Sequence, residues 1–253
     1  MISFYSGTPG SGKSLQMAHE VVDWIKKYKK NVIANTVIDR NYILKKKKGG
    51  LFFYIENDKL TTDFLYKYAL KFNEMGVEHQ CLLVIDEAQV KFSPTAVKLS
   101  SQDNPRYRQD WLEFFTHHRH LGFDILIISQ FDRLIDPQIR CCFEFNYVHR
   151  KANNFGFIGM LLTIFRIPLF VQIQYWYGVN QVSGKKFFTY SKKYSKIYNS
   201  YIYREQIIAK LTAKYGAETM QKLMGFRNAT SNVKFKPKKV KEDQTLVNAQ
   251  FEN

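Results

Sequence analysis

The residues with the clearest chemistry stand at the start of the chain. Gly7, Gly12, Lys13 and Ser14 have the spacing G-x-x-x-x-G-K-S of a phosphate-binding P-loop. Glycines let the backbone curl so that its N–H groups point at an anion, and the dipole of a following helix adds to the attraction. The pattern therefore predicts a nucleotide-binding loop, in preference to a chance Gly/Ser/Pro turn. Its members are Gly7, Thr8, Pro9, Gly10, Ser11, Gly12, Lys13 and Ser14.

A second motif supplies carboxylates. Cys81–Ile85 is a continuous apolar run, as a parallel strand covered on both faces requires, and Asp86 and Glu87 follow it. This is the Walker B pattern, in which Asp86 assists the Mg²⁺ that the Ser14 hydroxyl binds, and Glu87 polarises the attacking water. Lys13 would reach the outer phosphates. An Asp-Glu pair also begins many helices, but the upstream P-loop favours catalysis.

A third polar group ends another run that is predicted to be a buried strand, residues 124–130. Gln130 at the tip of this run is a candidate sensor of the γ-phosphate or orienter of the attacking water; the alternative is a residue that only closes the strand with a hydrogen bond. Arg119 and Arg140 are candidates for an arginine finger, which neutralises charge on the transferred phosphoryl group. The sequence neither chooses between the two arginines nor excludes that they form surface ion pairs.

Alternating strands and helices are expected to position these groups. An apolar run over residues 1–5 leads into the loop, and apolar residues at helical spacing follow it up to Ile25. The other predicted elements are strands at residues 31–35, 51–55 and 142–148, and helices at residues 61–75 and within 105–119. This order predicts an α/β P-loop NTPase fold, with a mostly parallel sheet flanked by helices and ligands bound at the carboxyl ends of its strands.

Composition and charge limit the kinds of partner that the chain is expected to bind. The chain of 253 residues is 45% hydrophobic, which supports a substantial core, and its net charge is +16. Residues 151–253 hold 17 Lys and Arg against 5 Asp and Glu, which indicates an anionic partner, either nucleic acid or an acidic membrane surface. Lys-rich codon usage would give the same excess. The 3 cysteines have no metal-ligand spacing or disulfide framework and favour a reducing compartment, and no cleavable signal peptide is recognised.

The C-terminal part is predicted to extend the core with aromatic, basic strands and a helix. Residues 155–171 are apolar, but Arg166 and Pro168 interrupt them before the ~20 residues that a spanning helix needs. We expect an apolar protrusion here, either a membrane or subunit contact or plain core, followed by an exposed-edge strand over residues 172–178. The predicted domains are 1–150, the ATPase core; 151–200, the protrusion and edge strands; 201–232, a helical segment; and 233–253, a basic, polar, disordered tail.

Several motifs together are similar to one known family. They are residues 7–14, 85–89, 118–124, 128–130, 135–140 and 175–178. In this order they resemble the N-terminal domain of the zonular occludens toxin (Zot) family, over about residues 1–200. The resemblance implies a P-loop ATPase of the additional-strand type, in the FtsK/HerA-like branch, with ATP and Mg²⁺ as cofactors. It also implies that the strand before Gln130 lies between the strands that carry the P-loop and Asp86.

The family includes assembly and export proteins of filamentous phages. The resemblance therefore implies a motor for virion assembly and extrusion, acting as a homo-oligomeric ring at the cytoplasmic face of the bacterial host's inner membrane. Phage assembly or coat proteins are expected partners, as is the membrane surface, through residues 155–171 and basic side chains. Such members usually carry a transmembrane helix after the ATPase domain, whereas residues 244–253 here are polar. Attachment would then come from a partner or from residues 155–171, unless the chain is truncated.

Three other functions fit parts of the sequence. A DNA-translocating or DNA-packaging ATPase would use the basic C-terminal third to bind phosphates. A nucleotide-gated scaffold would bind ATP with little hydrolysis, which Glu87 argues against. A small-molecule kinase would need an acceptor site, and no motif for one is recognisable.

Overall fold

The fold is that of a computed structural model, which describes residues 1–39, 49–154 and 168–198, together with residues 156, 159, 160, 164, 165, 212 and 216. Met1–Tyr198 form one compact unit. Part of the predicted protrusion (155–171), almost all of the predicted helical segment (201–232) and all of the predicted tail (233–253) lie outside the described residues. The predicted domain boundaries therefore stay predictions.

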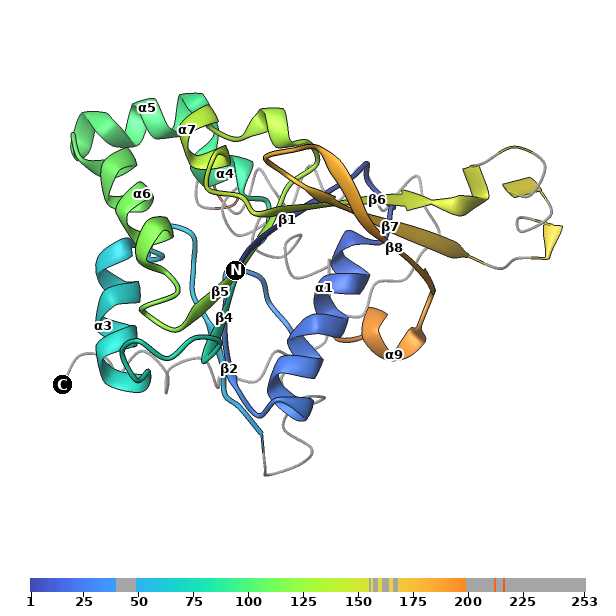
Figure 1. The fold of residues 1–253 in the computed structure, drawn as a ribbon, viewed down its shortest axis with the longest axis horizontal. Coiled ribbons are helices and arrows are strands. Elements are labelled where there is room, and N and C mark those ends of the chain that lie inside the picture. The colour runs from blue at the N-terminus through green and yellow to red at the C-terminus, as the bar shows by residue number, and fades with distance from the viewer. Residues whose placement is uncertain are drawn as a thin grey trace. The chain divides into compact units, whose positions relative to one another are not determined.

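Strands and helices alternate along most of the described chain (Figure 1). The strands are β1 (Ile2–Ser6), β2 (Asn31–Ala34), β3 (Phe52–Tyr54), β4 (Cys81–Ile85), β5 (Phe123–Ile128), β6 (Phe145–Lys151), β7 (Leu169–Trp176) and β8 (Gln181–Thr189). The α-helices are α1 (Lys13–Val22), α3 (Thr62–Phe72), α4 (Gln89–Phe92), α5 (Pro94–Asp103), α6 (Tyr107–His117), α7 (Pro137–Arg140) and α9 (Lys192–Ser195). A π-helical turn over Asp23–Lys27 extends α1, and 3₁₀ turns cover Asp132–Leu134 and Ala152–Asn154.

The described strands form one 8-stranded sheet in the order β3-β2-β4-β5-β1-β6-β7-β8. All pairs from β3 to β6 are parallel, and the pairs β6–β7 and β7–β8 are antiparallel. β5 lies between β1, which leads into the P-loop, and β4, which leads into Asp86. The prediction of an α/β fold with a mostly parallel sheet and an additional strand between the two Walker strands is confirmed.

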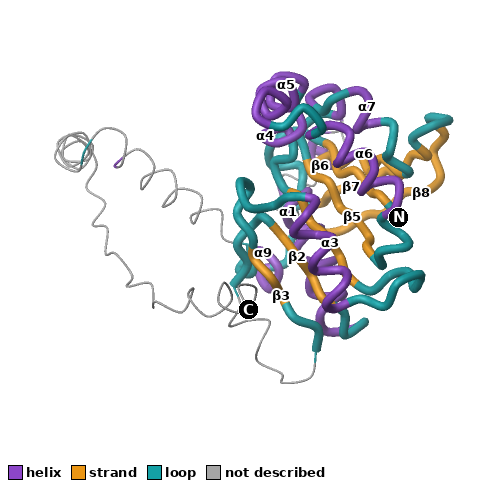
Figure 2. Tube along the Cα trace, turned by 90° about the vertical axis from the view of Figure 1, so that its left-hand side faces the viewer, coloured by secondary structure: helices purple, strands orange, loops and turns teal. Residues whose placement is uncertain are grey.

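Helices cover both faces of the central strands. Figure 1 shows α1 on one side of β4 and β5, and α3 and α6 on the other. Every residue of β1, β4 and β5 is accordingly buried. Successive side chains of a strand point to opposite faces, so a strand covered on both faces is mostly apolar. The buried polar residues in these three strands are Ser3, Ser6 and Asp124. In both views α4, α5 and α7 lie together at the top (Figures 1 and 2).

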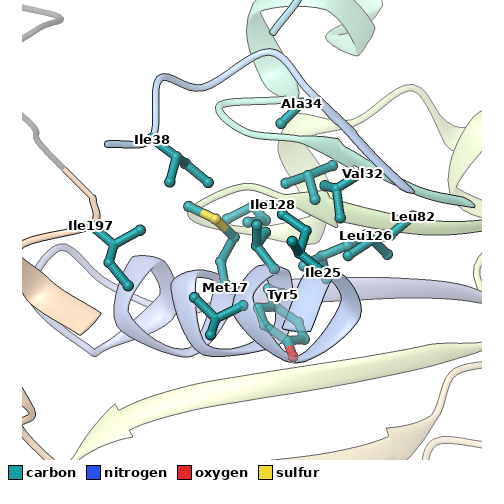
Figure 3. Packing of buried hydrophobic residues seen from close by; sticks show 13 residues of the cluster. Tyr5, Met17, Ile25, Val32, Ala34, Ile38, Leu82, Leu126, Ile128 and Ile197 are labelled. Atoms are coloured by element: carbon teal, nitrogen blue, oxygen red, sulfur yellow. The ribbon is translucent and has the colours of Figure 1, made fainter. Parts of the chain in front are cut away.

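One apolar cluster fills the space between α1 and the sheet, and ten of its members are labelled in Figure 3. Its buried members are Tyr5, Met17, Val21, Val22, Ile25, Val32, Ala34, Ile38, Leu82, Val84, Leu126, Ile128 and Ile197. Ile38 and Ile197 come from segments far apart in the sequence and are 2% and 0% exposed. The chain after β8 therefore returns to pack on α1, which carries the P-loop at its start.

The opposite face of the sheet is packed with aromatic rings. Trp111 and Phe114 of α6 are buried, and the Trp111 ring meets Phe92 of α4 edge to face, with centroids 4.9 Å apart. Phe114 packs on Phe123 of β5 at 5.6 Å. Such pairs add about 0.5–1.5 kcal/mol beyond the area they bury. They fix α4, which begins two residues after Glu87, relative to β5.

Two strand predictions need correction. β6 begins at Phe145 and not at Cys142, because residues 141–143 close the turn after α7, where the Phe143 N–H donates to the carbonyl of Arg140 at 3.1 Å. The predicted edge strand over residues 172–178 falls in β7, which pairs on both sides, so the strand at this edge of the sheet is β8.

Helix α5 was not predicted, although the sequence holds a signal for its start. Ser93 accepts a hydrogen bond from the N–H of Ala96 at 3.2 Å, and Pro94 occupies the first helical turn. Both are typical of helix N-termini. Hydrophobic spacing does not predict this helix, because its apolar content is low and Val97 is its one buried residue.

Replacing Met17 by alanine would remove a side chain that is 0% exposed between α1 and the sheet. We expect the free energy of unfolding to fall by about 2–5 kcal/mol, because the change leaves a cavity in a packed core. Met75→Ala, at a position 52% exposed, is the matched control, with an expected change below ~0.5 kcal/mol. Urea denaturation followed by circular dichroism measures both, and equal small losses would contradict the packing described.

Candidate active site

The P-loop, Asp86, Glu87 and Gln130 come together at one edge of the sheet. Because β1, β4 and β5 are parallel, the segments that follow them leave from the same edge. Backbone hydrogen bonds join these segments. The N–H of Gly7 donates to the carbonyl of Gln130 at 2.9 Å, and the N–H of Ala88 donates to the carbonyl of Ile128 at 2.9 Å. The strand order implied by the family resemblance is thus confirmed, and Gln130 lies beside the start of the P-loop.

The P-loop backbone takes conformations that favour glycine. The φ angle is +141° at Gly7 and +94° at Gly12. A Cβ atom at Gly7 would lie 2.4 Å from the carbonyl oxygen of His149, so space also requires glycine there. At Gly12 a Cβ would meet the ring of Phe170 at 3.0 Å and that of Phe188 at 3.1 Å. The hairpin of β7 and β8 therefore packs directly against the loop and supports it.

Lys13 lies inside the curl of the loop. Its ammonium donates to the carbonyl of Gly7 and, at 3.2 Å, to that of Thr8. Burial lowers the pKa of Lys13, against the opposing pull of the Walker B carboxylates. The hydroxyl of Ser11 is buried in the same loop with no hydrogen-bond partner among the described residues. The loop thus offers a cation and an unpaired hydroxyl where a P-loop binds phosphate.

Asp86 is 4% exposed, and Asn35 fixes its backbone. The side-chain oxygen of Asn35 accepts from the Asp86 N–H at 2.7 Å, and its amide donates to the Asp86 carbonyl at 2.8 Å. Asn35 follows β2 directly, so it continues the pairing of β2 with β4 where the backbone ladder ends. The Asp86 carboxylate accepts from the N–H of Glu87 at 2.9 Å.

The environment of Asp86 raises its pKa to about 6. Burial is the main cause, because it disfavours the charged form, and the charge of Glu87 acts in the same direction. The Glu87 N–H and the charge of Lys13 partly offset the rise. A cation held against Asp86 would favour the ionised carboxylate. Asp86 is therefore poised to gain from a bound metal ion.

Glu87 is exposed and has a φ of +48°, which is uncommon for a residue other than glycine. Its carboxylate accepts from the side-chain amide of Gln89, and the Gln89 oxygen accepts from the hydroxyl of Ser129 at 2.7 Å. A chain of side-chain hydrogen bonds thus runs from the end of β5 to the candidate catalytic carboxylate. Strained backbone of this kind persists where the surroundings hold it, often at functional sites.

A cavity of about 510 Å³ opens beside the P-loop. Gly7, Thr8 and Gln130 line it together with Arg150 and Lys151 at the end of β6. A sensor of the γ-phosphate has to reach the volume next to the start of the P-loop, and Gln130 does so. Its role as sensor stays a prediction.

Neither candidate arginine lines this cavity. Arg119 donates to the carboxylate of Glu144 at 2.8 Å, and Glu144 also accepts from the N–H of Ile2 at 3.1 Å, at the amino end of β1. Arg119 therefore lies at the edge of the sheet opposite the P-loop. Arg140 ends α7, where its charge acts on Tyr177, whose pKa burial and a nearby aspartate raise to about 12. Their role as arginine fingers stays a prediction, which for Arg119 requires a neighbouring copy of the chain.

Ser14 and Asp86 would hold Mg²⁺. A hydroxyl and a carboxylate, completed by phosphate oxygens and water, suit this hard cation. The hydroxyl of Tyr198 lies 3.5 Å from the Asp86 carboxylate. Burial raises the pKa of Tyr198 to about 12 and the nearby Ser14 partly offsets this, so Ser14 and Asp86 both lie near the same phenol. Among the described residues, no group of three or more His, Cys, Asp or Glu side chains could hold a metal.

The sequence analysis assigned no role to Asn35, Gln89 or Tyr198. A signal for Asn35 exists, because a polar residue that ends an apolar run in a parallel sheet stands at the ligand-binding edge. Gln89 stands two residues after Glu87, but only the structure shows its bond to Ser129. Nothing in the sequence marks Tyr198, which meets Asp86 across 112 positions of chain.

Comparison with known proteins decides the family. The family model described as "Zonular occludens toxin (Zot)" matches residues 1–203. The chain belongs to the Zot family. The matched part of this Zot-family chain includes every element of the site, from β1 to α9. No curated protein is matched by the chain.

Solved structures resemble the Zot-family chain at low sequence identity. One solved ATPase domain is 7% identical in sequence, and the match covers 78% of this chain and 84% of that chain at a TM-score of 0.50. The N-terminal domain of zonular occludens toxin from Neisseria meningitidis is 18% identical, and the match covers 78% of this chain and 98% of that chain at a TM-score of 0.47. The genome packaging NTPase B204 from Sulfolobus turreted icosahedral virus 2, in complex with AMP, is 14% identical. That match covers 74% of this chain and 96% of that chain at a TM-score of 0.45. The likeness to the first of these, the ATPase domain, agrees with the P-loop NTPase fold derived above.

Asp86→Asn is expected to stabilise the protein at neutral pH when nucleotide and metal are absent. The pKa of Asp86 rises from its ordinary 3.8 to about 6 in the folded state, so folding binds a proton between these values. The free energy of unfolding of wild type, relative to the variant, should therefore fall as pH rises through this window, by about 1.4 kcal/mol per pH unit and about 3 kcal/mol in all. Above the window the difference should stay level. Urea denaturation at several pH values measures the difference. A difference that is independent of pH would contradict the buried, charged Asp86.

Proposed function

We propose that the chain is a Mg²⁺-dependent ATPase. The observation that carries this proposal is the convergence of the P-loop, Asp86, Glu87 and Gln130 at the carboxyl ends of three parallel neighbouring strands. A P-loop by itself binds nucleotide. The added carboxylate pair beside it, with one carboxylate buried and one exposed, is what hydrolysis needs.

Each group has one task in this proposal. The loop amides and Lys13 bind the phosphates, and Ser14 and Asp86 hold Mg²⁺. The bound ion would neutralise charge on the β- and γ-phosphate oxygens. Glu87 orients the attacking water and accepts its proton, because the carboxylate is exposed and Gln89 holds it. Gln130 contacts the γ-phosphate from the end of β5.

Glu87→Gln is expected to lower ATP turnover by roughly 10²–10⁴, because it removes the proton acceptor and keeps the shape of the side chain. Nucleotide affinity should stay within a few-fold of wild type. Lys13→Ala should lower both turnover and nucleotide affinity, because it removes the cation inside the loop. Release of inorganic phosphate and binding of a fluorescent ATP analogue measure the two effects. Unchanged turnover in both variants would refute the assignment.

We further propose that the active form is a homo-oligomeric ring in which an arginine of one copy, Arg140 or Arg119, completes the site of its neighbour. Mixing Glu87→Gln protein into wild type addresses this within the same assay. In a ring with coupled sites, activity falls faster than the fraction of wild-type protein. A strictly proportional fall would contradict the coupling.

For the work that ATP drives, we propose assembly and extrusion of filamentous phage at the cytoplasmic face of the host's inner membrane, with phage assembly or coat proteins as partners. Membership of the Zot family and the basic C-terminal third support this proposal. No helix within the described ranges is long and apolar enough to cross a bilayer. We propose that residues 155–171 and basic side chains contact the membrane surface.

A DNA-translocating ATPase is the second candidate. Arg150 and Lys151 line the cavity beside the P-loop, and the excess of Lys and Arg after residue 150 suits a polyanion. A motor at the membrane should be stimulated by vesicles rich in anionic lipid and not by double-stranded DNA. Stimulation by DNA, with an affinity that falls steeply as salt rises, would instead favour translocation of DNA.

A further inference from the structure

The segment after β8 folds back over the nucleotide-binding helix. It comprises Ser191–Tyr198 and is here named the strap. Ile197 is 0% exposed in the cluster that includes Met17 of α1, and the ring of Tyr194 lies 4.5 Å from that of His19, also on α1. Figure 3 shows Ile197 above α1, on the same side as Met17 and Ile38. The strap is therefore an integral part of the packing around α1.

The end of the strap is also tied to the segment that follows β2. The N–H of Asp39 donates to the carbonyl of Ile197 at 2.9 Å, and Ile38 forms an isolated antiparallel bridge with Tyr198. This segment begins with Asn35, which holds the backbone of Asp86. The backbone of Tyr198 is thus fixed close to the end of β4, where Asp86 lies.

The hydroxyl of Tyr198 points at the place where Mg²⁺ would bind. It lies 3.5 Å from Oδ2 of Asp86, with Ser14 nearby. Oδ2 is the carboxylate oxygen left over, because Oδ1 accepts from the N–H of Glu87. Ser14 and Asp86 are the two residues assigned to the metal, so the phenol lies beside the metal's proposed protein ligands.

We propose that Tyr198 competes with the hydrated Mg²⁺ of the nucleotide complex, so that binding of Mg·nucleotide displaces its hydroxyl and loosens the end of the strap. The inference rests on the proposed Mg²⁺ site at Ser14 and Asp86. Mg²⁺ keeps several water ligands in octahedral geometry, and such a shell needs the space next to the Asp86 carboxylate that the phenol oxygen occupies. A ligand shifts a conformational equilibrium by its differential affinity, and here the differential comes from this shared space.

The consequence is a mechanical link. Tyr198 is the last residue of the compact unit Met1–Tyr198, and the chain continues directly into the second unit, residues 199–253. Loosening the strap at Tyr198 would therefore report the state of the metal–nucleotide site to the start of the next part of the chain.

Tyr198→Phe tests the proposal, because it removes the hydroxyl and keeps the ring. Mg²⁺ is titrated into the complex of the full chain with ADP, and calorimetry measures the metal concentration at half-saturation. Competition predicts that the variant needs about 3–10-fold less Mg²⁺ than wild type, the range expected for loss of one hydrogen bond. Affinity for ADP in EDTA should be unchanged. Tyr194→Phe, on the same strap, is the matched control and should behave as wild type.

Hydrogen exchange gives a second readout that is independent of activity. With Mg²⁺ and a non-hydrolysable ATP analogue, the amide of Asp39, which bonds to Ile197, should exchange faster than in nucleotide-free protein. In Tyr198→Phe that difference should shrink.

The outcomes separate the two claims. If wild type binds nucleotide with a dependence on Mg²⁺ but Tyr198→Phe has an unchanged or higher requirement for the metal, competition is refuted and the ATPase proposal stands. If wild type binds nucleotide without any dependence on Mg²⁺, the proposed metal site fails and the inference fails with it. Slower exchange at Asp39 in the Mg·nucleotide state would also refute it.

Discussion

The parallel pairing of β5 with both β1 and β4 is the constraint on which the site depends. Each of these strands is buried along its whole length, so a shift of register would force every side chain into packing shaped for another residue on both faces. The pairing brings the P-loop, Asp86 and Gln130 to one edge without direct bonds between their side chains. Helices on both faces and the aromatic packing of α6 on β5 hold the pairing in place.

Within that frame, the site is assembled from charged groups that gain little from one another. Lys13 bonds to backbone carbonyls of its own loop, and Asp86 is buried beside a like charge at Glu87. Burial lowers the pKa of Lys13 and raises that of Asp86, so each charge is costly while the site is empty. An anion against the loop and a cation against Asp86 would relieve both costs. The same arrangement that weakens the empty site therefore favours Mg·nucleotide.

Local sequence patterns predicted most of the elements of the fold and the residues of the central site. The P-loop spacing and the apolar runs before Asp86 and Gln130 were sufficient for the elements around them, whereas the strand order came from the resemblance to the Zot family. Contacts across long stretches of chain were not predictable, because no local pattern encodes them: Asn35 holds Asp86 across 51 positions, and Tyr198 meets it across 112. The start of β6 was predicted too early because residues 141–143 are as apolar as a strand. Their backbone instead forms the turn after α7, and β6 begins at Phe145.

A crystal structure of the full chain with Mg²⁺ and a non-hydrolysable ATP analogue tests the central claim most directly. The account predicts the phosphates inside the curl of residues 7–14, Mg²⁺ between Ser14 and Asp86, and Gln130 facing the γ-phosphate. It also predicts a water held by Glu87 at about 2.6–3.2 Å and in line with the γ-phosphate. Nucleotide bound away from the P-loop, or a γ-phosphate out of reach of both Glu87 and Gln130, would contradict it.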